Sequence, residues 1–172
     1  MKRLSKKQIE EAFKVLSTQL GKPKTPYELF IVGGAALVLL FNARETTKDV
    51  DIVQIDPAIR VASRKVAAQL DLPEDWINDG AKGYVHGIAK GEVIFRSSTL
   101  IIRTLALPQL LAMKLCAWRD DLDIEDARLV LSKMCSNKND VWSRIEPHLV
   151  PGRELKARYA FEDLWESMYG LG

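Results

Sequence analysis

Two neighbouring stretches decide the fold: Phe30-Ile-Val-Gly33-Gly34-Ala-Ala36 and Arg44-Glu-Thr46-Thr-Lys48-Asp49-Val-Asp51-Ile52. In the first, a short aromatic and β-branched run stops at two glycines, and the apolar residues 35–41 then suit a buried helix. Glycines that open a helix let a phosphate approach the backbone N–H groups and the positive end of the helix dipole. The first stretch therefore predicts a strand, a glycine turn and a helix, with a phosphate site at Gly33 and Gly34.

The second stretch places two carboxylates in an apolar strand, which is predicted over residues 50–55. Asp49 and Asp51 lie two residues apart, so their side chains point to the same face of the strand, roughly 7 Å apart along the backbone. Two such carboxylates repel each other unless water, basic groups or a cation compensate, and hard divalent cations prefer oxygen ligands. Mg²⁺ is the natural candidate, with Mn²⁺ as the alternative.

The rest of the chain predicts helices around this centre. Ser5 and Gln8 have the spacing of a capping box that opens a helix to about Gly21, and Asp56 followed by Pro57 opens another to about Leu70. Residues 71–91 are expected to form a long functional or capping loop. A hairpin is predicted from strands 93–95 and 99–105, and helices from residues 108–118, 124–134, 140–146 and 153–169. The predicted organisation is a core of residues 1–107 with a helical region, 108–172, packed on it as a single compact unit.

The two opening stretches resemble the signature of the polymerase-β-type nucleotidyltransferase superfamily. Downstream, residues 110–119 and 123–126 resemble the helical motif of the bacterial branch that includes AbiEii-type toxins, and Trp76-Ile-Asn78-Asp79 is similar to that branch as well. The resemblance covers about residues 28–131. It implies an α/β (α+β) nucleotidyltransferase fold, with a mixed, partly antiparallel sheet flanked by helices and a C-terminal helical region.

The resemblance also implies an activity: Mg²⁺-dependent transfer of a nucleoside monophosphate from an NTP to a hydroxyl on an RNA such as tRNA, on a protein or on a small molecule. A toxin paired with an antitoxin protein is one form that this activity takes in the bacterial branch. Gly33 and Gly34 would cradle phosphate, and Asp49 and Asp51 would be catalytic and bind two metal ions. The remaining candidates are catalytic Lys114 and the nucleotide-binding residues Arg44, Thr46, Lys48, Asp123 and Asp126. The alternative is a non-catalytic nucleotide-binding or partner-binding module of the same fold.

Several candidates have a structural interpretation beside the functional one. Lys114 lies in a helix that is otherwise apolar, where it needs a carboxylate or a phosphate as partner. It therefore either contacts phosphate or forms a salt bridge with Asp123 or Asp126, while Arg44 and Lys48 contact phosphate or belong to a solvated turn. Members of the superfamily commonly supply a third carboxylate from a neighbouring strand, but residues 99–105 contain none. Glu92 and Asp123 are the remaining candidates for that role.

The bulk composition limits the function classes. A formal net charge of +2 is too small to argue for nucleic-acid binding by itself. The longest apolar run, residues 29–41, is too short for a membrane span, and no apolar signal-peptide core follows the basic N-terminus, so a cytoplasmic location is expected. Cys116 and Cys135 are predicted to be buried thiols. The basic residues Arg153, Lys156 and Arg158 either contact an RNA or form a solvated helix face.

Overall fold

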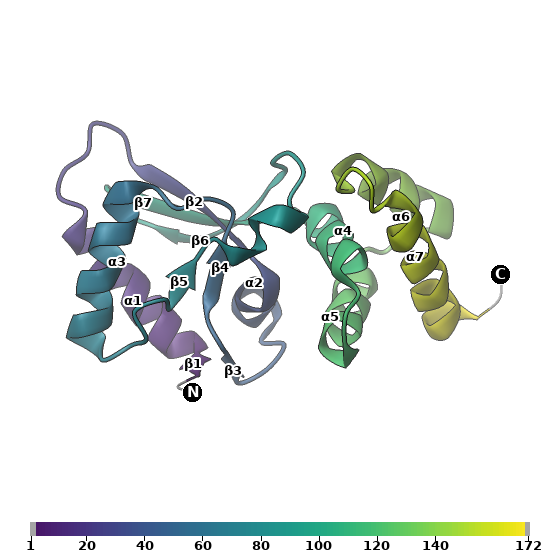
Figure 1. Cartoon of the computed structure of the whole chain (residues 1–172), viewed down its shortest axis with the longest axis horizontal. Coiled ribbons are helices and arrows are strands. Elements are labelled where there is room, and N and C mark those ends of the chain that lie inside the picture. The colour runs from purple at the N-terminus through teal and green to yellow at the C-terminus, as the bar shows by residue number, and fades with distance from the viewer. Residues whose placement is uncertain (1–2, 171–172) are drawn as a thin grey trace. The chain divides into compact units, whose positions relative to one another are not determined.

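A computed structural model describes residues 3–170, in two units (Figure 1). Residues 3–82 and 90–104 form the first, here called the sheet unit. Residues 83–89 and 105–170 form the second, here called the helical unit. The chain therefore leaves the sheet unit after residue 82, returns to it at residue 90 for a hairpin, and leaves it again after residue 104 to complete the helical unit.

A mixed sheet forms the centre of the sheet unit, with strands in the order β5-β4-β2-β7-β6. At its middle, β2 (Tyr27–Val32) pairs antiparallel with β4 (Val50–Ile52) and parallel with β7 (Leu100–Leu105). Next to β4 lies β5 (Ile77–Asn78), parallel to it, and next to β7 lies β6 (Lys90–Arg96). The predicted mixed, partly antiparallel sheet with flanking helices is confirmed.

The two faces of this sheet differ in burial. One face is lined mainly by buried apolar side chains, which include Leu29, Ile31, Val50, Ile52, Ile77, Leu100 and Ile102. Helices α1 (Lys6–Gln19) and α3 (Pro57–Leu70) cover that face, where the Phe13 ring of α1 packs on Phe95 and Trp76 at 6.2 and 6.3 Å between centroids. The other face, here called the open face, keeps partly exposed side chains: Glu28, Phe30, Asp51, Asn78, Ile101 and Arg103. A polar site therefore has room on the open face.

The helices of the sheet unit begin where local chemistry predicts. The Ser5 side chain accepts from the Gln8 N–H and the Gln8 side chain accepts from the Ser5 N–H, so the predicted capping box of α1 is confirmed. Asp56 caps α3, with Pro57 at its first turn. Between them, α2 (Gly33–Phe41) starts directly on the first glycine and packs against β2, β4 and β3 (Thr46–Thr47).

Some elements differ from the expectation. The predicted strand at residues 50–55 ends at Ile52, although the Val53 N–H still donates to the Phe30 carbonyl at 3.0 Å. The expected loop at residues 71–91 contains β5 and a 3₁₀ helix, Gly80–Tyr84. Thr46 and Thr47 of β3 pair with β1 (Leu4–Ser5), which no periodic pattern predicted. Strands of two residues are too short to show a hydrophobic alternation.

Four helices make up most of the helical unit. They are α4 (Leu107–Ala117), α5 (Asp121–Ser132), α6 (Lys138–Ile145) and α7 (Glu154–Tyr169), close to the predicted ranges. The almost fully buried α4 packs against the other three. Cys116 on α4 is buried as predicted, but the prediction for Cys135 was wrong, because α5 ends at Ser132 and Cys135 lies in the exposed turn that follows. Over residues 3–170, no helix is long and apolar enough to cross a membrane.

Candidate functional site

The glycine turn brings the start of α2 against a carboxylate. Gly33 has a φ of +65°, in the left-handed region that favours glycine. A Cβ added there would stand 3.1 Å from Oδ2 of Asp51, so the backbone and the carboxylate are in close approach. Val32, at the N-cap, makes no side-chain hydrogen bond to the first turn of α2. The predicted phosphate turn and one of the predicted metal ligands are therefore neighbours.

The close approach of Gly33 to Asp51 predicts that a methyl group added at Gly33 destabilises the fold. Gly33→Ala should cost roughly 1–2 kcal/mol of unfolding free energy through its left-handed backbone, and more through the contact with Asp51. Gly21 is a matched control, because its φ is +67° and a Cβ there meets nothing within 4 Å. Urea denaturation should therefore show a larger loss for Gly33→Ala than for Gly21→Ala. Equal losses would mean that the approach to Asp51 has no energetic consequence.

The second glycine lies against a cation. A Cβ at Gly34 would be 2.8 Å from a terminal nitrogen of Arg44 and 3.2 Å from Oγ1 of Thr47, so the Arg44 guanidinium lies at the first turn of α2. Thr46 faces elsewhere, since its Oγ1 accepts from Nε of Arg3 at 2.9 Å. Lys48 is exposed on the turn before Asp49. The structure thus brings Arg44 to the glycine turn, adds Thr47, which the sequence did not single out, and leaves the roles of Thr46 and Lys48 as predictions.

The second carboxylate is oriented by an amide from β5. Asp49 lies just before β4, and its Oδ2 accepts from Nδ2 of Asn78 at 3.2 Å. The side-chain oxygen Oδ1 of Asn78 accepts from the Gly80 N–H at 2.8 Å, which fixes the orientation of the side-chain amide. Asn78 also pairs with Asp51 across the parallel strands. The sequence assigned no role to Asn78. Its position beside the carboxylates results from the pairing of β5 with β4, which the sequence does not reveal.

The donor set fits one hard cation. Mg²⁺ is commonly held by one or two carboxylates, while water and substrate phosphates complete its octahedron, and Asp49 and Asp51 can supply that pair. Across residues 3–170 there is no group of three or more His, Cys, Asp or Glu side chains placed to hold a metal. Glu92 lies on β6, which β2 and β7 separate from β4. The carboxylate of Asp123 is already bound by Lys114 and Arg119.

A cavity of about 340 Å³ adjoins Asn78 on the sheet unit. Helix α3 contributes Arg60 and Arg64 to its wall, and the segment before β5 contributes Glu74 and Asp75. Arg64 is paired with Glu74 at 3.0 Å, and Arg60 approaches Asp79 at 3.9 Å. The cavity therefore has a mixed, largely compensated charge and sits beside the amide that orients Asp49.

In the helical unit, Lys114 forms the salt bridges that its apolar surroundings require. Its Nζ lies 2.9 Å from Oδ1 of Asp123 and 2.7 Å from Oδ2 of Asp126, and all three side chains are nearly buried. Burial would raise the pKa of Asp123, but hydrogen bonds from Arg119 and Lys114 outweigh it and hold that pKa below its usual value. The structural interpretation of Lys114 thus has direct geometric support, while a phosphate contact stays a prediction.

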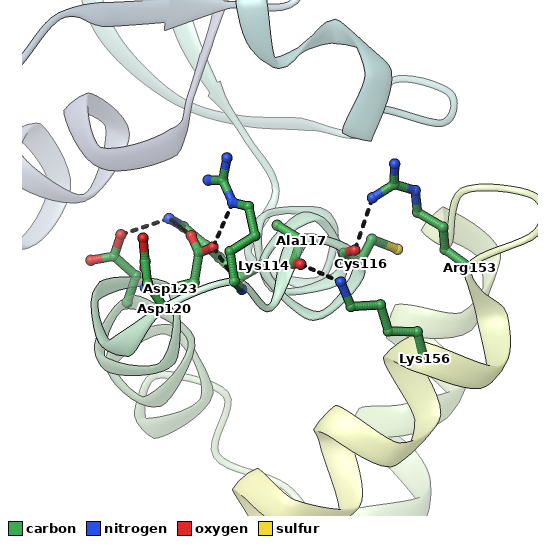
Figure 2. Close-up of polar contacts among 9 residues, drawn as sticks. Lys114, Cys116, Ala117, Asp120, Asp123, Arg153 and Lys156 are labelled. Atoms are coloured by element: carbon green, nitrogen blue, oxygen red, sulfur yellow. Dashed lines mark hydrogen bonds and ion pairs between the residues drawn. The ribbon is translucent and has the colours of Figure 1, made fainter.

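The basic residues at the start of α7 also have partners in the helical unit (Figure 2). Arg153 donates to the Cys116 carbonyl at 3.1 Å and Lys156 to the Ala117 carbonyl at 2.6 Å, so both cations cap the C-terminal end of α4. Arg158 pairs with Glu162 at 2.7 Å. Arg153, Lys156 and Arg158 therefore each have a partner within the helical unit, and a contact with RNA stays a prediction.

Comparison with known proteins gives one family. Residues 7–141 match the model of a family described as "Nucleotidyltransferase of unknown function (DUF6036)", a range that includes Gly33, Gly34, Asp49, Asp51 and Lys114. No match was found among curated proteins or among solved structures. The match spans most of the chain, and its description agrees with the fold that the sheet unit displays. The chain belongs to this family of nucleotidyltransferases.

Proposed function

We propose that this protein transfers a nucleoside monophosphate from an NTP to a hydroxyl acceptor and that it requires Mg²⁺, with Mn²⁺ as a substitute. The observation that carries the proposal is the close approach of Asp51 to Gly33, because it puts a metal ligand next to a helix start suited to phosphate. A nucleotide phosphate at that turn would reach the backbone N–H groups and the cation together. The family supports the class of reaction, and the acceptor and metal are our proposals.

Each residue of the site has a distinct task in this proposal. The N–H groups at the start of α2 and the Arg44 guanidinium bind phosphate oxygens of the NTP. Asp49 and Asp51 hold the divalent cation, and Asn78 fixes the direction of the Asp49 carboxylate. When bound, the cation lowers the pKa of the acceptor hydroxyl and neutralises charge on the phosphates. We assign Lys114, Asp123 and Asp126 to holding the helical unit together, the alternative that their ion pairs support.

For the acceptor we propose an RNA hydroxyl, with tRNA as the first substrate to test. The support is the resemblance of residues 110–126 to AbiEii-type toxins, which also makes an antitoxin protein the expected partner and the cytoplasm the expected location. A non-catalytic nucleotide-binding module is the second candidate. The donor set favours that candidate, since within the described chain it offers two carboxylates where the superfamily commonly has three.

The test is label transfer from each of the four NTPs to a mixed tRNA pool, with Mg²⁺ or Mn²⁺ and with a chelator. The expected result is metal-dependent labelling by the wild-type protein and none by Asp49→Ala/Asp51→Ala. Melting temperature with Mg²⁺ and NTP reports nucleotide binding, which both candidates predict, because a ligand selective for the folded state stabilises it. A melting shift without labelling of RNA, protein or small molecules would support the binding module. Labelling that survives the double substitution would refute the proposed metal site.

A further inference from the structure

Arg103 shares the open face with the carboxylates. In the β2–β7 pairing Arg103 lies opposite Phe30, and in the β2–β4 pairing Asp51 lies opposite Val32. Phe30 and Val32 are two residues apart on β2 and point to the same face, so Arg103 and Asp51 do as well. Two strand spacings across the sheet and two residues along it separate their backbones by roughly 12 Å. Both side chains can therefore reach a ligand that lies across β2.

A fixed carboxylate holds the Arg103 side chain. Its Nε donates to Oε1 of Glu28 at 2.8 Å, and Lys90 Nζ binds Oε2 of the same carboxylate at 2.7 Å. Lys90 also lies over the Phe30 ring, 5.7 Å from its centroid. The hydrogen bond from Lys90, with help from Arg103 and against the effect of burial, lowers the pKa of Glu28, so this carboxylate stays charged. Glu28 thus orients Lys90 and Arg103 on the open face. Because one carboxylate binds two cations, this group of three side chains carries a net charge of about +1.

The Arg103 guanidinium has hydrogen-bond donors that suit the phosphates of a nucleoside triphosphate. The contact to Glu28 uses Nε, and a guanidinium carries its other N–H donors on two terminal nitrogens in a planar fork suited to phosphate oxygens. The Arg103 side chain is 24% exposed, so a ligand on the open face can contact it. Within residues 3–170 no third acidic side chain joins Asp49 and Asp51 in a metal-binding group, and one or two carboxylates are the usual protein ligands of a single Mg²⁺. Arg103 therefore supplies a positive charge on the open face without a second metal ion.

We infer that Arg103 binds the triphosphate of the NTP directly and that the site works with one divalent cation. This inference rests on the proposed function, because it assumes that the nucleotide lies at the Gly33 turn. Glu28 is a positioning residue in this arrangement, since its carboxylate binds the Arg103 guanidinium, and Lys90 in turn binds that carboxylate. Arg103 thus determines that the ligand is a polyphosphate: a nucleoside or a monophosphate at the turn gains less from it than a triphosphate does.

The test measures nucleotide binding without metal and metal stoichiometry with nucleotide. With a chelator present, calorimetry should show a Kd for NTP that rises roughly 10- to 100-fold in Arg103→Met, as the loss of a charge-assisted contact predicts. Arg103→Lys should lie between that variant and wild type. Arg96→Met is the matched control, because Arg96 is an exposed arginine at the end of the neighbouring strand β6, and its Kd should be unchanged.

The Mn²⁺ count keeps the inference testable if Arg103→Met does not fold. Electron paramagnetic resonance of wild-type protein saturated with NTP should count one Mn²⁺ per chain, and two would overturn the inference. An equal NTP affinity of Arg103→Met and Arg96→Met would overturn it too, while leaving the proposed function standing. If wild-type protein binds no NTP with or without metal, both the proposed function and this inference fail.

Discussion

Replacing Lys114 by methionine should lower the free energy of unfolding by about 3 kcal/mol, because removing one partner of a buried ion pair leaves an uncompensated charge behind. Lys114 serves two carboxylates at 2.9 and 2.7 Å, and the side chains of Asp123 and Asp126 are 3% and 4% exposed. Methionine has a similar length, so lost packing adds little. Urea denaturation followed by fluorescence is a suitable measurement, since Trp118, Trp142 and Trp165 belong to the helical unit.

An exposed ion pair in the same unit supplies the control. Arg144 and Asp140 are 3.9 Å apart and about half exposed, so Arg144→Met should cost about 0.5 kcal/mol or less. If Lys114→Met were no more damaging than Arg144→Met, the buried cluster would not stabilise the helical unit. A role of Lys114 in phosphate binding would then be the better explanation for a cation in this helix.

The pH dependence of the stability of Lys114→Met tests whether the buried carboxylates cause its loss of stability. The pKa of Asp123 is lowered in the folded protein, so its contribution to stability is present above the usual value of 3.8 and is lost as the pH falls through the folded value. In Lys114→Met, the burial that opposes ionisation of Asp123 acts with less compensation, so the variant gains stability when this carboxylate is protonated. The difference in unfolding free energy between wild type and variant should therefore be large at pH 7 and shrink below about pH 4.

The sequence predicted most of this fold because its long elements carry strong local signals. The capping box at Ser5, the Asp56-Pro57 start of α3 and the apolar run before Gly33 each have a local physical cause, and each is where it was expected. Strand β5 could not be predicted in that way. It consists of two residues, and its place beside β4 depends on pairing between Val50 and Ile77, which are far apart in the chain.

The residues of the candidate site also fall into those that local sequence predicts and those that strand pairing brings together. The glycines and the two aspartates were predictable because the spacing of a strand and a helix start is local. The positions of Asn78 and Arg103 required the register of the sheet, since a strand sequence alone does not tell which of its two faces meets a given neighbour. Thr47 lies in a separate two-residue strand, and its approach to Gly34 follows from no local pattern. Lys114 is intermediate: its apolar helix predicted a charged partner, and the structure identifies Asp123 and Asp126 as that partner.

Replacing Asp51 by asparagine should reduce label transfer by roughly 10²- to 10⁴-fold, because the stabilisation that a bound cation supplies amounts to several kcal/mol and each 1.36 kcal/mol is a tenfold change in rate. Asparagine keeps the size and shape of the side chain beside Gly33 and removes the charge. Asp51 is half-buried on the open face and asparagine keeps a polar side chain there, so the loss of unfolding free energy should be smaller than the loss of transition-state stabilisation.

The large loss of transfer without a matching loss of stability is what distinguishes a metal ligand from a structural carboxylate. Asp75→Asn is the control, since Asp75 is an exposed carboxylate of the same unit that precedes β5. It should retain full transfer, and Asp51→Asn should also require more Mn²⁺ for half-maximal NTP binding than Asp75→Asn does. Transfer by Asp51→Asn within threefold of wild type would remove this carboxylate from the catalytic site. Because Asp51 is the ligand that approaches the glycine turn, the proposed coupling of metal and phosphate at α2 would be lost with it.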